Sequence, residues 1–148
     1  MVSIEQIKKL REETEVSISE CKKALEEAKG DFKKAKEILR KWGRELAGKK
    51  AGRGTGLGIV ESYIHPDKRI GAMIELCCET DFVAKSDDFK SLAHELCLQI
   101  AAIDPEENEF MSQTWIKDEV KTIKDLIDEY VAKLGENIIV KRFSRFEI

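Results

Sequence analysis

The sequence contains no uninterrupted apolar run of the roughly 18 residues that a membrane-spanning helix requires. Its first ten residues, MVSIEQIKKL, lack the apolar segment and the cleavage site of a secretory signal. Hydrophobic residues make up 42% of the chain and charged residues 37%, which is typical of a soluble globular protein. We therefore expect a cytoplasmic protein without a membrane partner.

Cysteine is scarce, and its spacing predicts neither disulfides nor a metal site. The four cysteines are Cys21, Cys77, Cys78 and Cys97, and no two of them form a C-x-x-C pair. The adjacent Cys77 and Cys78 would point to opposite faces of a strand, which suits neither a disulfide nor tetrahedral metal coordination. We expect buried free thiols and no bound metal.

Catalytic motifs are also missing from the sequence. There is no G-x-S-x-G, and neither His65 nor His94 belongs to an H-E-x-x-H spacing. Glu79 and Asp81 come nearest to a carboxylate pair, but they flank a predicted corner and no further acid or base accompanies them. We expect no catalytic residue, and hence a protein that is not an enzyme.

A glycine-rich segment, GRELAGKKAGRGTGLG over residues 43–58, does not predict a nucleotide site. Its glycines match neither G-x-G-x-x-G nor G-x-x-x-x-G-K-[ST], and it precedes a strand, whereas a phosphate loop joins a strand to a helix. We expect no cofactor and no direct nucleotide binding. The mixture of glycine and basic residues is typical of a flexible linker, which we place at residues 46–56.

Residues 1–45 predict a compact module of three short helices. Capping-box spacings at Ser3 and Ser17 mark the starts of the first two helices. Gly30 separates the second helix from the third, and Gly43 is expected to end the third. Helices this short are marginal in isolation, so they must share a small core.

Residues 57–148 predict the larger part of an α+β protein, in which helices pack against an antiparallel sheet of three strands. The expected elements are strands over residues 57–64, 69–79 and 138–148, and helices from about Ser86 to Ile103 and over about residues 117–134. The second strand alternates between two faces, and the helices carry apolar stripes from Phe89 to Ile103 and from Val120 to Leu134. Residues 106–114 are acidic and are expected to be irregular.

The corner between the second strand and the first of these helices carries a large aromatic residue, Phe82, beside Asp81. Two interpretations of this corner are open. Phe82 either folds back under the sheet as a core residue, or it is held out for another molecule to receive.

Positive charge is concentrated in the N-terminal part of the chain. Residues 1–53 contain 15 Lys and Arg against 10 Asp and Glu, whereas residues 54–148 contain 11 against 19. The basic segment KGDFKKAKEILRKWGR is interleaved with Phe32 and Trp42, but both aromatics fall on the apolar stripe of the helix, where they cannot stack on bases. We do not expect a nucleic-acid partner, although an RNA- or ribosome-associated module acting through this basic half remains the alternative.

Three segments, in the correct order, resemble the elongation factor Ts family. They are TEVSISECKKALEEAKGDFKKAKEILRKWG (residues 14–43), RIGAMIELCCETDFVAKSDDF (69–89) and AKLGENIIVKRFSRFE (132–147). The second holds the family's Thr-Asp-Phe-Val signature, and the chain is similar to a short form of the family with a single core unit. The first resembles the family's N-terminal module of ubiquitin-associated type.

The resemblance implies a guanine-nucleotide exchange factor for elongation factor Tu, which promotes GDP release during translation elongation. In this family the corner is inserted near the magnesium site of the GTPase, and the loop before the second helix contacts a helix of the GTPase. Where the family usually has Gly-x-Gly-Met-Met, this loop reads Glu-Val-Ser-Ile-Ser. The residues implied to bind the partner are Thr80, Asp81, Phe82 and Val83 at the corner, and Val16, Ile18 and Ser19 in the loop.

The resemblance also implies a homodimer, because short members of the family pair two chains. Residues 57–148 would then be both the core and the dimerisation domain. A second alternative, a structural or ubiquitin-like-ligand adaptor that uses only residues 1–45, would leave the corner without a role.

Overall fold

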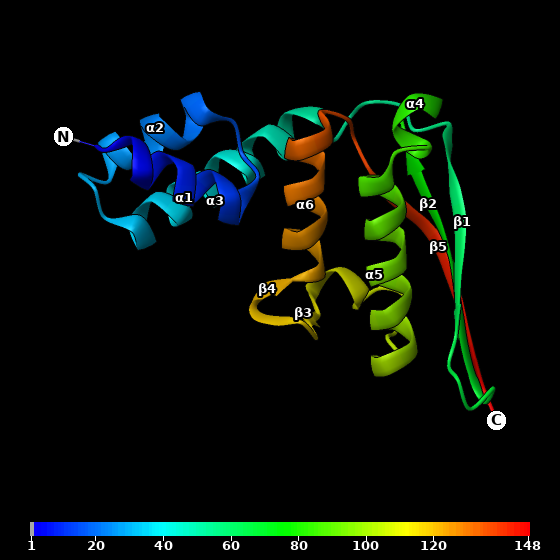
Figure 1. Cartoon of the computed structure of the whole chain (residues 1–148). Helices are drawn as coiled ribbons and strands as arrows, with labels where there is room; N and C mark the ends of the chain where they lie inside the picture. Colours follow the sequence, from blue (N-terminus) through cyan, green and yellow to red (C-terminus); the bar gives the residue numbers. More distant parts are fainter. Residues whose placement is uncertain (1) are drawn as a thin grey trace.

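The chain forms an α+β structure in which helices cover one face of an antiparallel sheet (Figure 1). The coordinates are a computed structural model, and they describe residues 2–148. The three main strands are β1 (Leu57–Ile64), β2 (Ile70–Cys78) and β5 (Ile139–Glu147), in the order β1-β2-β5. The expected strands and their antiparallel arrangement are confirmed.

Strand pairing follows the alternating pattern of β2, the central strand. Leu76 pairs with Ile59 on one side and with Val140 on the other, and the register shifts between Glu75 and Leu76. Gly58 of β1 lies so close to β2 that a Cβ atom there would be 2.1 Å from the carbonyl oxygen of Leu76. This glycine of the glycine-rich segment therefore serves strand pairing.

Helix α5 (Asp87–Ile103) packs against the inner face of the sheet, as its apolar stripe predicts. Ser86 caps the helix by accepting a hydrogen bond from the amide of Phe89 at 3.2 Å. The buried stripe meets Ala72, Ile74, Leu76 and Cys78 of β2; it consists of Phe89, Leu92, Leu96 and Ile100. Ile103, expected to continue the stripe, is 47% exposed, because the helix ends there with Asp104 in the left-handed conformation.

Helix α6 (Ile123–Leu134) begins later than the sequence predicts. The expected helical segment 117–122 instead lies in a short hairpin of β3 (Thr114–Trp115) and β4 (Asp118–Thr122). Thr122 forms a capping box with Asp125, which starts α6, and Val120 is left exposed on β4. The expected irregular segment before the hairpin contains a 3₁₀ turn, η1 (Phe110–Ser112), with Phe110 buried.

Three helices precede the sheet, as expected: α1 (Ile4–Thr14), α2 (Ile18–Glu27) and α3 (Phe32–Lys50). Ser3 and Ser17 cap the first two. These helices enclose a small core of their own, distinct from the core beneath the sheet; its buried members are Leu10, Cys21, Ala24, Leu25, Ala28, Ala35 and Leu39.

The third helix is longer than predicted. It does not end at Gly43 but continues to Lys50, so residues 46–50 of the expected linker are helical. Gly43 faces Ala132 of α6, and Ala47 is buried in the main core. One glycine costs a helix only about 1 kcal/mol, which the packing of α3 on α6 offsets.

The cysteines behave as free thiols. All four are unpaired, and Cys21, Cys78 and Cys97 are buried, while Cys77 is half-buried. Burial raises the pKa of the Cys97 thiol to about 12, so this thiol is inert at neutral pH. Among the described helices, none combines the length and the apolar character that a membrane crossing needs.

Candidate functional site

The predicted corner is a single helical turn, α4 (Asp81–Ala84), between the end of β2 and the start of α5 (Figure 1). Thr80 caps it, because its Oγ1 accepts a hydrogen bond from the amide of Val83 at 3.3 Å. Val83 and Ala84 are buried in the main core. The turn is therefore anchored by its second half, while its first half faces solvent.

Phe82 lies on the solvent side of this turn and is 87% exposed. The other aromatic residue of this segment, Phe89, is fully buried only seven positions later. The interpretation of Phe82 as a core residue is therefore wrong. The exposed ring of Phe82 on an anchored turn is available to a partner, and α4 is therefore the candidate site.

Asp81 is exposed beside Phe82 and forms an ion pair with Lys85, with Oδ2 and Nζ 2.8 Å apart. A hydrogen bond to this carboxylate raises the pKa of the Lys85 ammonium above its usual value. An ion pair in solvent is held weakly, so Asp81 is free to exchange Lys85 for a cationic group of a partner.

Behind the turn lies a residue that the sequence analysis missed. Glu136, in the loop between α6 and β5, accepts hydrogen bonds from the amides of Glu79 and Thr80 and from the Thr80 hydroxyl. In these contacts the two partners are separated by 56 or 57 positions along the chain, so no local sequence pattern predicts them.

The loop expected to make the second contact joins α1 to α2. Val16 lies in this loop and is half-buried, whereas Ile18 (55% exposed) and Ser19 (exposed) lie in the first turn of α2. In Figure 1, α6 stands between helices α1 and α2 on one side and α4 on the other. The two groups of expected site residues are thus not brought together into one site.

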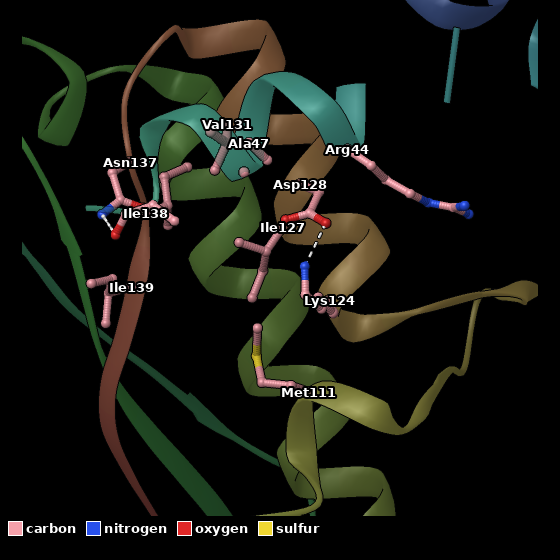
Figure 2. A pocket seen from close by; sticks show the side chains of 12 residues that line it. Arg44, Ala47, Met111, Lys124, Ile127, Asp128, Val131, Asn137, Ile138 and Ile139 are labelled. Carbon is pink, nitrogen blue, oxygen red and sulfur yellow. Dashed lines mark hydrogen bonds and ion pairs between the residues drawn. The ribbon is translucent and has the colours of Figure 1, made fainter. Parts of the chain in front are cut away.

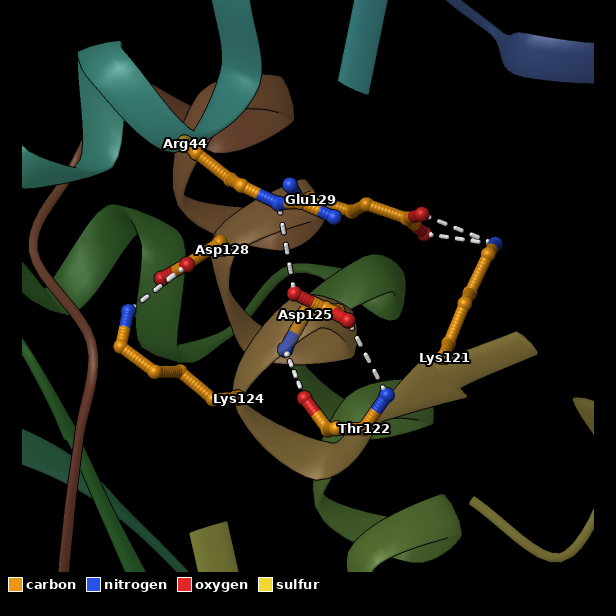
Figure 3. A network of polar contacts seen from close by, with 7 residues as sticks. All are labelled: Arg44, Lys121, Thr122, Lys124, Asp125, Asp128 and Glu129. Carbon is orange, nitrogen blue, oxygen red and sulfur yellow. Dashed lines mark hydrogen bonds and ion pairs between the residues drawn. The ribbon is translucent and has the colours of Figure 1, made fainter. Parts of the chain in front are cut away.

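The N-terminal helices are nonetheless fixed to the core by polar contacts. Figure 3 shows Arg44 of α3 beside Asp125 of α6, with Nε and Oδ1 3.4 Å apart. At the other end of α6, Lys133 bonds to both Glu15 and Asp88, and the bond to Asp88 measures 3.2 Å. Glu15 precedes the loop of Val16, so this loop has a defined position relative to α5 and α6.

A cavity of about 250 Å³ between α3, α6 and β5 offers little to a ligand (Figure 2). Its charged groups are already paired, since Lys124 and Asp128 are 2.9 Å apart and Arg44 pairs with Asp125 of α6. Apolar side chains such as Ala47, Ile127 and Val131 form much of the remaining lining. Residues 2–148 also contain no group of three or more His, Cys, Asp or Glu residues placed to hold a metal ion.

Comparison with known proteins gives a consistent result. Residues 79–148, which include α4 and Glu136, match the profile of the family described as "Elongation factor TS". The chain is 40% identical to "Elongation factor Ts" of Thermoanaerobacter sp. (strain X514), with 99% of this chain and 95% of the relative covered. It is 43% identical to "Elongation factor Ts" of Thermotoga sp. (strain RQ2), with 99% and 96% covered.

A third relative, "Elongation factor Ts" of Thermotoga petrophila, is 44% identical, with 99% of this chain and 96% of the relative covered. The aligned region with the Thermoanaerobacter relative extends over 193 positions, whereas this chain has 148 residues. That relative therefore contains about 45 residues for which this chain has no counterpart.

Proposed function

The chain belongs to the elongation factor Ts family and is a nucleotide exchange factor for elongation factor Tu, and we propose that it releases GDP by presenting Asp81 and Phe82 near the magnesium site of that GTPase. The observation that carries this mechanism is the 87% exposure of Phe82 on an anchored turn. As a translation factor, the protein would act in the cytoplasm.

The physical basis is competition between two ligands of the GTPase. In GTPases of this class, Mg²⁺ bridges the nucleotide phosphates and is held by a hydroxyl of the phosphate loop. A ring inserted beside the ion disturbs its coordination and weakens the hold on GDP. By linkage, bound GDP weakens the binding of the exchange factor by the same ratio. The factor therefore needs no catalytic residue, only a surface that favours the nucleotide-free GTPase.

A second contact is proposed for the N-terminal helices. Residues 1–45 would form a module of ubiquitin-associated type that meets a helix of the GTPase through Val16, Ile18 and Ser19. Its separate small core supports this division, with residues 46–56 as the connection and 57–148 as the core domain. The connection is not a flexible linker over its whole length, because its first five residues belong to α3.

Replacing Ile18 by aspartate tests this second contact. We expect the concentration needed for half-maximal exchange to rise about tenfold, because a charge would replace an apolar contact, a loss of about 1.4 kcal/mol. Folding should be preserved, since Ile18 is exposed and an acid suits the first turn of a helix. Ile4→Asp is the matched control: Ile4 is also exposed, and it also follows a capping serine at the start of a helix. Equal losses in the two variants would remove the loop from the interface.

We further propose that two chains associate as a homodimer. The helices cover only the inner face of the sheet, so the outer face is left to solvent in a single chain. Four large apolar residues on that face are at least half exposed: Val60, Ile64, Met73 and Phe146. A second copy of the sheet offers them a matching apolar surface.

The function itself is tested by the release of fluorescent GDP from elongation factor Tu in a stopped-flow experiment. We expect the protein to accelerate release in proportion to its concentration until the GTPase is saturated. The RNA-binding alternative predicts salt-sensitive binding to RNA and no effect on GDP release. The structure favours exchange, because Phe32 and Trp42 pack against the small N-terminal core and are not free to stack on bases.

A further inference from the structure

We propose that Glu136 is the residue that positions Phe82 for exchange, an inference that rests on the proposed function. The carboxylate lies behind α4 and uses both of its oxygens. Oε1 accepts hydrogen bonds from the amides of Glu79 and Thr80, at 3.1 and 3.0 Å. Oε2 accepts the hydroxyl hydrogen of Thr80 at 2.6 Å.

These bonds determine the direction of the Thr80 side chain. With its hydrogen directed to Glu136, the Thr80 oxygen has its lone pairs free for the amide of Val83, 3.3 Å away. The same side chain is thus fixed from behind by Glu136 and caps α4 in front. A helix of one turn has almost no stability of its own, so the orientation of α4 depends on this cap and on the burial of Val83 and Ala84.

Glu136 is in turn held in place by its neighbours. Gly135 ends α6 in the left-handed conformation, with φ 78°, which turns the chain back towards β2. The next residue, Asn137, is buried; its amide donates to Glu79 Oε2 at 2.6 Å. The side-chain amide of Asn137 donates to the carbonyl oxygens of Ala51 and Arg53, at 3.2 and 2.9 Å.

The corner is therefore bonded to two distant segments, the loop of Glu136 and Asn137 and the segment of Arg53. Glu79 contacts both, because its carboxylate accepts from the Asn137 amide and pairs with Arg53, with Oε1 and Nη1 3.6 Å apart. The ring of Phe82 is 87% exposed, so its direction depends on the backbone of α4. Without Glu136, the amides of Glu79 and Thr80 would bond to water and the Thr80 side chain would be free to rotate. The ring would then sample many directions, and its insertion would lose the benefit of preorganisation.

Glu136→Ala tests this inference through GDP release from elongation factor Tu at a fixed, subsaturating concentration of the factor. We expect release to slow about tenfold, which corresponds to about 1.4 kcal/mol. Glu136→Gln should lose less, since its amide oxygen can still accept the two backbone amides. Glu129→Ala is the matched control, because Glu129 also uses both carboxylate oxygens, which bond to Lys121 at 2.8 and 3.0 Å, but it lies on α6 away from these contacts. We expect it to exchange normally.

A double variant separates positioning from a general loss of structure. If Glu136 acts through Phe82, then Glu136→Ala should slow exchange by less than about twofold when Phe82 is already alanine. A full tenfold loss in that background would overturn the inference, and so would normal exchange by the single variant. Hydrogen exchange of the Glu79 and Thr80 amides gives a second readout in the free protein. Their protection should fall in Glu136→Ala and persist in Phe82→Ala, and unchanged protection would also overturn the inference.

The same experiment distinguishes this inference from the mechanism on which it rests. If Phe82→Ala alone leaves GDP release unchanged, the proposed insertion of the ring is wrong. If Phe82→Ala slows release and Glu136→Ala does not, only the positioning role is wrong.

Discussion

Replacing Phe82 by alanine is expected to slow the release of GDP from elongation factor Tu by a factor of about 30 or more and to leave thermal unfolding nearly unchanged. Truncating an aromatic residue that is buried at an interface commonly costs about 2 kcal/mol or more, and each 1.4 kcal/mol is a factor of ten. In the free protein the ring is 87% exposed, so its removal takes away little that stabilises the fold. Stopped-flow release and thermal unfolding measure the two effects separately.

Phe89 provides the matched reference for this prediction. It is the same residue type on the neighbouring helix, but it is fully buried. Phe89→Ala should therefore lower the free energy of unfolding by about 3–5 kcal/mol. At a temperature where it remains folded, it should still exchange at a rate close to that of the unchanged protein. If Phe82→Ala instead melts early and exchanges normally while folded, the ring belongs to the core in solution and the proposed mechanism fails.

The elements that the sequence predicted well are those with strong local signals. The start of α5 is one, because Ser86 is followed by two acids in the first turn and then by an apolar stripe. The alternating pattern of β2 is another: of the five residues predicted to share one face, Ala72, Ile74, Leu76 and Cys78 are buried and Ile70 is half-buried. In both cases the residues that define the element are neighbours in the sequence.

The hairpin before α6 shows where this reasoning fails. Val120 lies at a helical spacing from Ile123, which favoured a helix from residue 117. What fixes the hairpin is Gln99, a buried residue of α5. Its side-chain amide donates to the carbonyl oxygen of Thr114 at 3.0 Å and accepts from the amide of Ile116 at 2.9 Å. This tertiary contact outweighs the helical periodicity of the apolar residues, and the local sequence does not predict it.

The candidate site shows the same limit. The sequence located the corner and reduced Phe82 to two alternatives, but the choice between them depends on what covers the corner in three dimensions. The exposure of Phe82 follows from the packing of Val83 and Ala84, which turns the other half of α4 outwards. Glu136 could not be found at all, since its hydrogen bonds to the corner join segments more than 50 residues apart.

The largest expected effect is on the dissociation constant of the proposed homodimer. Met73 lies on the outer face of the central strand, where it is 53% exposed and flanked by Ser62 and Ser144 in the neighbouring strands. In a symmetric dimer through this face, every substitution is present twice. Met73→Glu would therefore place two further carboxylates in that interface. Burying charges against like charges costs several kcal/mol, so the dissociation constant should rise about a thousandfold or more.

Light scattering at micromolar concentration measures this effect as a fall from the mass of a dimer to that of a monomer. Val120→Glu is the control, because Val120 is a comparably exposed apolar residue on β4, outside this sheet. That variant should remain a dimer. A monomer mass for the unchanged protein would overturn the proposal, whereas a dimer that survives Met73→Glu would place the interface elsewhere. Because Met73 lies within β2 and α4 follows the end of that strand, a folded Met73→Glu monomer would also show whether one core with one Phe82 suffices for exchange.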